Sequence, residues 1–309
     1  MGLIPERVET FGQDATNRIQ PYGREPKDLP TDVGVQRNME LFYKQIFQNM
    51  HKGIVKIIVC IMESIVLYKS PYPKQRIGRQ CDGGYVTIEL PEEYDVFLSG
   101  GIADDVSFEI DFLSKQPNLM CYAFDGTINS LPEYHNRIVF VKKNLSNIMN
   151  DELDNLEEFM EEYKNIFMKI DIEGHEFTLM PSLIEKGYMS NIKQLVIEIH
   201  SAGDIQMHPD YYSGLSHVTN DIMFTMLANI NKTHTLVHLH ANNACKIQQV
   251  DGINLPHVFE LTYIRNDYVD VRIKNEEPLP TIYDIPNYKH IPEYQLSGFP
   301  YSTDRKNTL

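Results

Sequence analysis

From about residue 94 onward, short apolar segments alternate with amphipathic ones. The apolar segments predict β-strands at residues 95–99, 119–124, 138–141, 166–170 and 194–200. The amphipathic segments predict helices near residues 104–114, 152–163, 175–185 and 211–228. Apolar strands separated by helices are typical of a parallel sheet covered on both faces. Two further strands, 235–240 and 257–265, have only a loop (241–256) between them, so we expect an antiparallel pair at one edge.

The flanking segments follow a different pattern. Residues 1–36 are rich in Pro, Gly and charge and predict an extended arm, and residues 38–68 predict one or two helices. Beyond residue 265 the chain is rich in Pro and Tyr and predicts an irregular tail. We therefore divide the chain into an N-terminal extension (1–73), an α/β domain (74–270) and a tail (271–309). The arm and tail are also compatible with a homo-oligomer.

The charge and composition of the chain argue against some classes of binding partner. The net charge is −15, with no Lys/Arg-rich segment, which disfavours binding to nucleic acid or to an anionic membrane. The apolar segment 53–68 is interrupted by Lys56 and Glu63 and is shorter than the ~20 residues of a membrane span. The N-terminus lacks the apolar core of a signal peptide, and the four cysteines show no C-x-x-C spacing. We expect a cytoplasmic protein.

The turn after the first strand is the first candidate binding site. It reads Ser99-Gly100-Gly101-Ile102-Ala103-Asp104-Asp105, and glycines there let the backbone approach a ligand closely. It is not the G-x-G-x-x-G of dinucleotide-binding proteins, and its two aspartates repel a pyrophosphate. The second strand ends at Asp125, about 20 residues later, where an acid is placed to bind ribose hydroxyls or merely opens a turn.

The fourth and fifth strands end in ionisable residues. Asp171 and Glu173 follow strand 166–170, and Glu198 and His200 lie on one face of strand 194–200. If the two strands are neighbours, Asp171, Glu198 and His200 converge. Such a cluster can hold a divalent cation, remove a proton, or form only a satisfied hydrogen-bond network. His240 lies on the next strand, with Asn242 and Asn243 beyond it.

Together these residues resemble the FkbM-like branch of class I S-adenosylmethionine-dependent methyltransferases, over about residues 74–266. The string Lys-Ile-Asp-Ile-Glu-Gly-His-Glu at 169–176 is the most specific part of the match. Weaker matches are Arg76-Ile77-Gly78, Asp82-Gly83-Gly84-Tyr85, Ser99-Gly100-Gly101-Ile102 with 105–109, Phe124-Asp125, 196–200, 238–240 and Asn242-Asn243. Ala103 departs from the pattern, which often has a glycine there.

The resemblance implies a Rossmann-like seven-stranded sheet and S-adenosylmethionine as cofactor. It implies that Gly100, Gly101 and Asp125 hold the methionine and ribose portions, and we add Ile102, Asp105 and Asp171 to the expected cofactor site. It further implies O-methylation of a sugar hydroxyl, on a glycan or nucleotide-sugar of polysaccharide biosynthesis.

For the chemistry we favour His200 as base, with Asp171 as the alternative. In metal-dependent proteins of this broad fold, carboxylates at these strand ends bind a divalent ion. Asp171, Glu198 and His240 are therefore the predicted ligands of Mg²⁺ or Mn²⁺. Two other functions stay open: a methyltransferase of a small natural product, and a non-catalytic glycan- or nucleotide-binding subunit.

Overall fold

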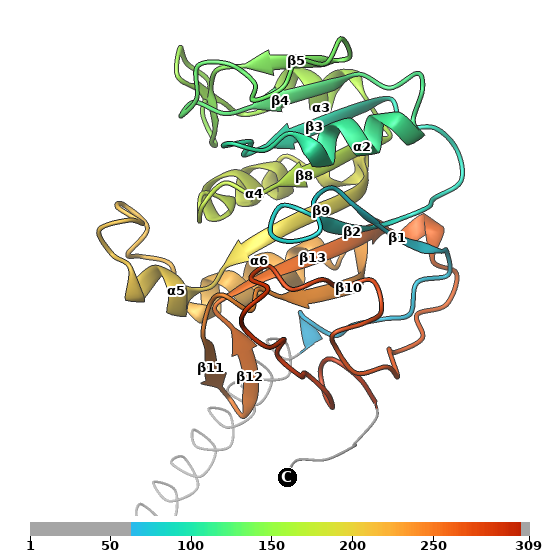
Figure 1. Cartoon of the computed structure of the whole chain (residues 1–309), viewed down its shortest axis with the longest axis vertical. Coiled ribbons are helices and arrows are strands. Elements are labelled where there is room, and N and C mark those ends of the chain that lie inside the picture. The colour runs from blue at the N-terminus through green and yellow to red at the C-terminus, as the bar shows by residue number, and fades with distance from the viewer. Residues whose placement is uncertain (1–62, 304–309) are drawn as a thin grey trace, which may run out of the picture. The chain divides into compact units, whose positions relative to one another are not determined.

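The computed structural model describes residues 63–303, and its centre is one sheet of seven strands (Figure 1). The strands lie in the order β5-β4-β3-β8-β9-β13-β10. Their bounds, in that order, are Ile138–Val141, Cys121–Phe124, Val96–Gly100, Ile166–Ile170, Ile192–His200, Val258–Arg265 and His234–Ala241. The first five are parallel, and β13 is antiparallel to both of its neighbours. The predicted α/β sheet with an antiparallel pair at one edge is confirmed; in addition, the last strand enters between β9 and β10.

Helices cover both faces of this sheet, as the apolar strands required. Helix α2 (Ser107–Lys115) lies in front of the sheet in Figure 1, where Phe97 and Phe167 of the strands pack against it. Helices α3, α4 and α6 belong to the core on the opposite face. Their bounds are Glu157–Glu162, Glu176–Glu185 and Asn220–Ile230. Side chains alternate along each strand, so Leu98 and Met168 face this second core.

Helices α3 and α6 begin later in the chain than predicted, α3 at Glu157 rather than near residue 152. Helix α6 begins at Asn220 rather than near residue 211, because Thr219 accepts a hydrogen bond from the backbone N–H of Ile222 and caps the helix there. The segment before it contains α5 (Ala202–Met207), which was not predicted, and a turn at Gly214 with φ +87°. Two short 3₁₀ helices, Tyr188–Asn191 and Asn266–Tyr268, complete the helical elements of residues 63–303.

A hairpin made of β1 (Lys74–Ile77) and β2 (Tyr85–Ile88) crosses the same face as α2. The Gln194 side chain of β9 accepts a hydrogen bond from the backbone N–H of Ile88, and the Thr262 hydroxyl of β13 donates to the carbonyl of Val86. These bonds fix the hairpin across two strands of the sheet. Its turn therefore lies above the strands' carboxyl ends, where ligands bind in open α/β sheets.

The segment predicted as a loop, 241–256, contains a second hairpin. Strands β11 (Ile247–Val250) and β12 (Ile253–Pro256) are joined by Asp251-Gly252, whose φ angles are +49° and +83°. Asp-Gly is the usual sequence of a two-residue turn with both φ angles positive. A further short pair consists of β6 (Asn144–Leu145) and β7 (Leu153–Asp154).

Within the described part of the chain, residues 271–303 form isolated bridges but no helix or extended ladder. This C-terminal segment is tied to β10 by a buried contact of 2.8 Å between Nε2 of His238 and Oδ1 of Asp284. The predicted N-terminal arm and most of the predicted N-terminal helical segment lie outside the described residues.

No helix of residues 63–303 is both long and apolar enough to cross a membrane.

Candidate active site

One row across the sheet carries most of the residues that the sequence singled out. It starts directly after the carboxyl ends of β4, β3 and β8 and continues within β9, β13 and β10. In register order the row consists of Asp125, Gly101, Asp171, Glu198, Glu260 and His240. Two cavities open over this row, and we call them the first and the second cavity.

The first cavity has a volume of about 450 Å³ and lies over the glycine turn that follows β3. Gly101 has φ +81°, and a Cβ atom there would lie 1.6 Å from the carbonyl oxygen of Asp171. Only glycine fits, because the two turns touch through their backbones. The buried ammonium of Lys169 donates to the Gly101 carbonyl oxygen (2.7 Å) and fixes the turn from below. Ala103, at the position where the family pattern often has glycine, adopts φ +48°.

Asp125 braces this turn. One carboxylate oxygen accepts the backbone N–H groups of Ile102 (3.0 Å) and Ala103 (2.8 Å), and the other accepts the N–H and hydroxyl of Thr127. Burial raises the pKa of Asp125, but these hydrogen bonds outweigh it and hold the pKa below its usual range. Four donors use the four acceptor positions of a carboxylate. A ribose hydroxyl can reach Asp125 only by displacing a donor, and the Thr127 hydroxyl is the one free to rotate away.

Asp105 joins the hairpin turn to the start of α2. Its carboxylate pairs with the guanidinium of Arg79 (2.8 Å) and accepts the N–H and hydroxyl of Ser107. Both Asp105 and Arg79 line the first cavity, as do Gly101, Ile102 and Asp125. Gly100, which we also predicted here, lies directly beneath, packed against Leu145.

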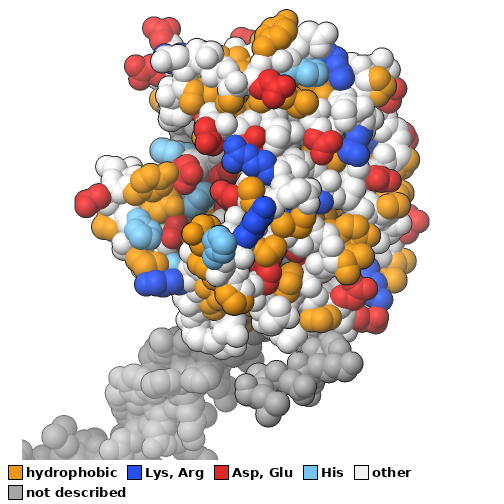
Figure 2. Space-filling view, viewed as in Figure 1, with side chains coloured by type: hydrophobic (Ala, Val, Ile, Leu, Met, Phe, Trp, Pro, Cys, Tyr) orange, Lys and Arg blue, Asp and Glu red, His pale blue; other side chains and the backbone are white. Residues whose placement is uncertain are grey.

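The second cavity, of about 410 Å³, adjoins the first. Four residues line both: Asp82, Asp171, Glu173 and Tyr211. Its remaining walls come from the end of β9, the segment around α5 and the loop after β10. Figure 2 shows a hollow on this side of the molecule, bordered mainly by acidic and histidine side chains. Two ligands, one in each cavity, would meet at Asp171 and Glu173.

Tyr85 links the two carboxylates that the sequence predicted to converge. Its buried hydroxyl lies 2.7 Å from Oδ2 of Asp171 and 3.2 Å from Oε2 of Glu198. Asn242 donates to the other oxygen of Glu198 (3.3 Å). Burial, together with the charge of Asp171, raises the pKa of Glu198 well above its usual range. Asp171 and Glu198 are therefore neighbours, as expected, and both lie within hydrogen-bond distance of the Tyr85 hydroxyl.

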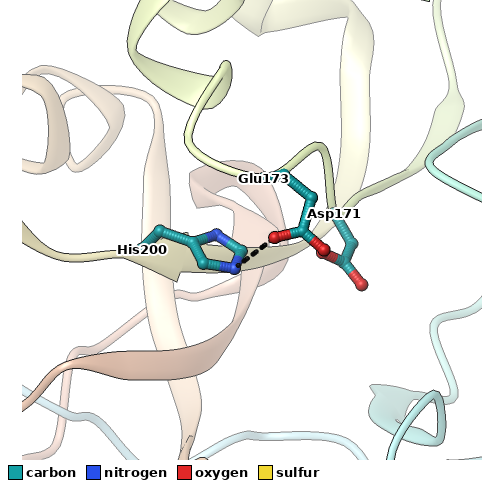
Figure 3. Close-up of side chains that lie close together, drawn as sticks. All are labelled: Asp171, Glu173 and His200. Carbon is teal, nitrogen blue, oxygen red and sulfur yellow. Dashed lines mark ion pairs between the residues drawn. The ribbon is translucent and has the colours of Figure 1, made fainter. Parts of the chain in front are cut away.

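His200 lies at the end of β9 and faces Glu173 (Figure 3). Its Nε2 is 3.2 Å from the Glu173 carboxylate, and its Nδ1 is 3.9 Å from Oε1 of the fully buried Glu176. Burial alone would lower the pKa of His200, but the hydrogen bond to Glu173 and the surrounding carboxylates raise it to about 10. In this arrangement the imidazole is a cation at neutral pH.

Asp171, Glu173 and His200 form a group that can bind a cation. One ligand atom from each lies within 4.8 Å of the others (Figure 3). Glu173 has φ +55°, a strained value for a residue with a side chain, and Gly174 follows with φ +85°. This turn directs the Glu173 carboxylate back towards Asp171 and His200.

The structure does not bring His240 into this group. Its two ring nitrogens face Oε2 of Glu260 and Oε1 of Glu293, each at 3.2 Å. His240 lies at the far end of the row, two strands beyond Glu198, and lines neither cavity. Of the three predicted metal ligands, only Asp171 belongs to this group; Glu173 and His200 complete it in place of Glu198 and His240.

Several residues of the site were not among the predicted site residues. They include Asp82, Glu173 and Tyr211, which line both cavities, and Tyr85, whose hydroxyl contacts Asp171 and Glu198. Tyr85 and Glu173 belong to matched motifs, but only the crossing hairpin and the left-handed turn show where their side chains lie. Tyr211 lies in a segment predicted as helix, and we find no signal in the sequence for its place at both cavities.

A family model for the methyltransferase FkbM domain matches residues 71–226. The chain belongs to the FkbM methyltransferase family. It is a methyltransferase that uses S-adenosylmethionine, and its sheet is the Rossmann-like sheet that the resemblance implied. The matched residues include the hairpin, the glycine turn, Asp125 and Asp171, which together build the first cavity.

Solved structures with a similar chain trace are more distant. A fibrillarin/Nop5p complex aligns with 58% of this chain and 76% of that chain, at 13% identity and a TM-score of 0.34. Precorrin-6y C5,15-methyltransferase from Geobacter metallireducens aligns with 57% and 83%, at 9% identity and a TM-score of 0.27. A plantazolicin methyltransferase in complex with SAH aligns with 56% and 77%, at 9% identity and a TM-score of 0.29. A comparison with curated proteins found no match.

Proposed function

We propose that this FkbM methyltransferase transfers the methyl group of S-adenosylmethionine to a sugar hydroxyl, in a glycan or a nucleotide-sugar. The observation that carries the proposal is that two cavities adjoin at Asp171 and Glu173. The first has the glycine turn and Asp125, as expected of a cofactor site. The second offers carboxylates, an amide and aromatic rings to an acceptor, and these groups suit a hydroxylated ligand.

The reaction needs alignment and removal of one proton. The acceptor oxygen forms a bond to the methyl carbon while the bond from that carbon to sulfur breaks, and the hydroxyl proton passes to a base. Holding the two reactants in line at the junction of the cavities lowers the barrier by reducing the entropy lost on reaction. Asp171 is the first proposed base, because it lines the second cavity and is placed at its junction with the first. His200 also lines the second cavity, but it can act as the base only after it has lost the proton that it carries in this arrangement.

A divalent cation such as Mg²⁺ or Mn²⁺ fits the group Asp171, Glu173 and His200. Two carboxylates and one imidazole are a suitable donor set, and Glu176 lies behind Nδ1 of His200, where a ligating histidine usually has a carboxylate partner. Such a cation would lower the pKa of the acceptor hydroxyl. Binding such a cation would require His200 to release the proton that it carries in this arrangement. The ligating nitrogen would then have no free lone pair, so His200 could not be ligand and base through the same atom.

The test is methyl transfer from labelled cofactor to a panel of glycans and nucleotide-sugars, read by mass spectrometry. We expect Asp171→Asn to lose at least 100-fold in rate, within the range of general-base catalysis. Asp151→Asn, an exposed change of the same kind outside both cavities, should not change the rate. Full activity of Asp171→Asn would contradict the assigned centre.

Two further outcomes separate the alternatives. Activity that survives exhaustive chelation would show that the reaction needs no divalent cation, and proton removal by a side-chain base would remain as the mechanism. Binding of S-adenosylhomocysteine without transfer to any carbohydrate would contradict the sugar substrate and favour a different acceptor.

A further inference from the structure

We infer that the acceptor is a sugar that carries no phosphate or carboxylate, so that the enzyme methylates a non-anionic unit of a glycan and not a nucleotide-sugar. This inference rests on the proposed function and narrows it. It follows from the charges, the donors and the aromatic rings that line the second cavity.

Acidic groups dominate the walls of the second cavity. They are five carboxylates: Asp82, Asp171, Glu173, Glu198 and Asp204. Two histidines, His200 and His208, are the cationic candidates, and neither Lys nor Arg is among the residues that line this cavity in the described part of the chain. A nucleoside diphosphate would bring two further negative charges into a space that already repels anions.

Apart from the divalent cation proposed above, which can itself bind a phosphate, the protein groups that usually bind phosphate are also absent from these walls. Proteins hold phosphates with Arg or Lys side chains, or with free N–H groups at a helix start. At the adjoining start of α5, the Ser201 hydroxyl already accepts the N–H of Asp204, and the Asp204 side chain adds negative charge there.

The cations of the first cavity are already engaged. Arg79 pairs with Asp105, and Lys169 donates to the carbonyl of Gly101. Both line the first cavity only, so neither is placed to compensate a phosphate in the second.

The same walls are well suited to an uncharged sugar. Sugar hydroxyls are hydrogen-bond donors, and ionised carboxylates are acceptors with several free positions. The Tyr211 ring, with 66% of the residue exposed, stands at the junction of the cavities and packs edge-on against the buried Tyr212, at 4.9 Å between centroids. An exposed aromatic face supported from behind can pack against the apolar C–H face of a sugar ring.

The experiment measures binding rather than turnover. Saturation-transfer NMR on the full chain loaded with S-adenosylhomocysteine compares methyl glycosides with the matching sugar 1-phosphates and nucleotide-sugars, with Mg²⁺ and with EDTA. We expect each neutral glycoside that binds to do so at least tenfold more tightly than its phosphorylated counterpart, in both buffers.

A matched pair of variants tests the electrostatic cause. His208 is exposed at the rim, with its Nε2 4.0 Å from Asp204. His208→Lys adds a permanent positive charge and should raise the affinity for the sugar phosphate, relative to that for the neutral glycoside, at least fivefold. His208→Gln shortens the same side chain without adding a positive charge, so it should not raise this ratio. Tyr211→Ala should weaken the neutral glycoside, and Tyr211→Phe should retain it.

The experiment distinguishes a failure of this inference from a failure of the proposed function. A sugar phosphate or nucleotide-sugar that binds as tightly as its neutral counterpart overturns this inference and leaves sugar methylation standing. If no carbohydrate of any charge binds, the proposed function fails, and the inference fails with it.

Discussion

The hydroxyl of Tyr85 lies 2.7 Å from Oδ2 of Asp171, although the two residues come from different parts of the fold. Tyr85 begins the second strand of the hairpin, and Asp171 follows the central strand β8. The hairpin therefore does more than cover the sheet, because it sets the position of the carboxylate at which the two cavities meet.

We expect Tyr85→Phe to lower both stability and activity. The variant keeps the edge-on packing against Phe108 but removes a buried hydrogen bond to a carboxylate, a loss of about 1.5–3 kcal/mol in the free energy of unfolding. Asp171 would then lose its orientation, so kcat should fall as well. Urea unfolding and a methyl-transfer assay measure the two effects.

Tyr94→Phe is the matched control for this change. The Tyr94 hydroxyl is also buried and accepts a hydrogen bond from Gln194 (2.6 Å), but Tyr94 lines neither cavity. It should lose stability and retain kcat. If both variants keep full activity, Tyr85 does not position Asp171.

Gly101→Ala should abolish cofactor binding. The added Cβ would lie 1.6 Å from the Asp171 carbonyl oxygen, so the glycine turn and the turn after β8 must move apart. Gly187→Ala has a comparable φ (+76° against +81°), but its Cβ would meet no atom within 4 Å. The control should lose only the about 1–2 kcal/mol of a left-handed residue with a side chain. Calorimetric titration with S-adenosylhomocysteine compares them, and equal affinities would show that the close contact is unimportant.

Asp125→Asn should weaken S-adenosylhomocysteine binding at least tenfold, equivalent to about 1.4 kcal/mol, and should also lower the stability of the ligand-free protein. The second effect is expected because Asp125 holds two N–H groups of the glycine turn before any ligand arrives. Thr127→Val removes one hydroxyl donor only and should have a smaller effect on stability. If Asp125→Asn weakens binding but leaves the ligand-free protein unchanged, Asp125 acts on the ribose alone.

The sequence predicted the sheet well because its strands are buried on both faces. Such strands read as continuous apolar segments whatever their tertiary partners, and the carboxylates that follow them are visible at the strand ends. The sequence could therefore predict that Asp171, Glu198 and His200 converge. In the structure β8 and β9 are neighbours, and all three residues line the second cavity.

The missed features depend on long-range contacts or on local backbone conformation. Strand β13 inserts beside β9, which separates β10 from the site and places His240 against Glu260 and Glu293. The left-handed turn at Glu173 brings a third group to Asp171 and His200, and no periodic pattern reports such a turn. The Asp251-Gly252 hairpin did have a sequence signal, since Asp-Gly favours a two-residue turn.

His240 gives a prediction about pH that is independent of catalysis. Its ring lies between Glu260 of β13 and Glu293 of the C-terminal segment, with Asp284 also near. Burial alone would lower the pKa of His240, but these carboxylates raise it to about 11, above the value of about 6.5 for an unfolded chain. Because the folded pKa is the higher one, the stabilisation is complete below about pH 6.5. It declines as the pH rises, and it is lost above about pH 11.

We expect the stability difference between the wild type and His240→Gln to shrink steadily from pH 7.5 to pH 10.5 in urea unfolding. His234→Gln is the matched control, because burial lowers the pKa of His234 to about 4 and its ring is neutral over this whole range in both the folded and the unfolded chain. Its difference from the wild type should stay constant. A His240→Gln difference that is equally constant would mean that the ring is neutral between its two carboxylates, and that the C-terminal segment is held there by packing instead of charge.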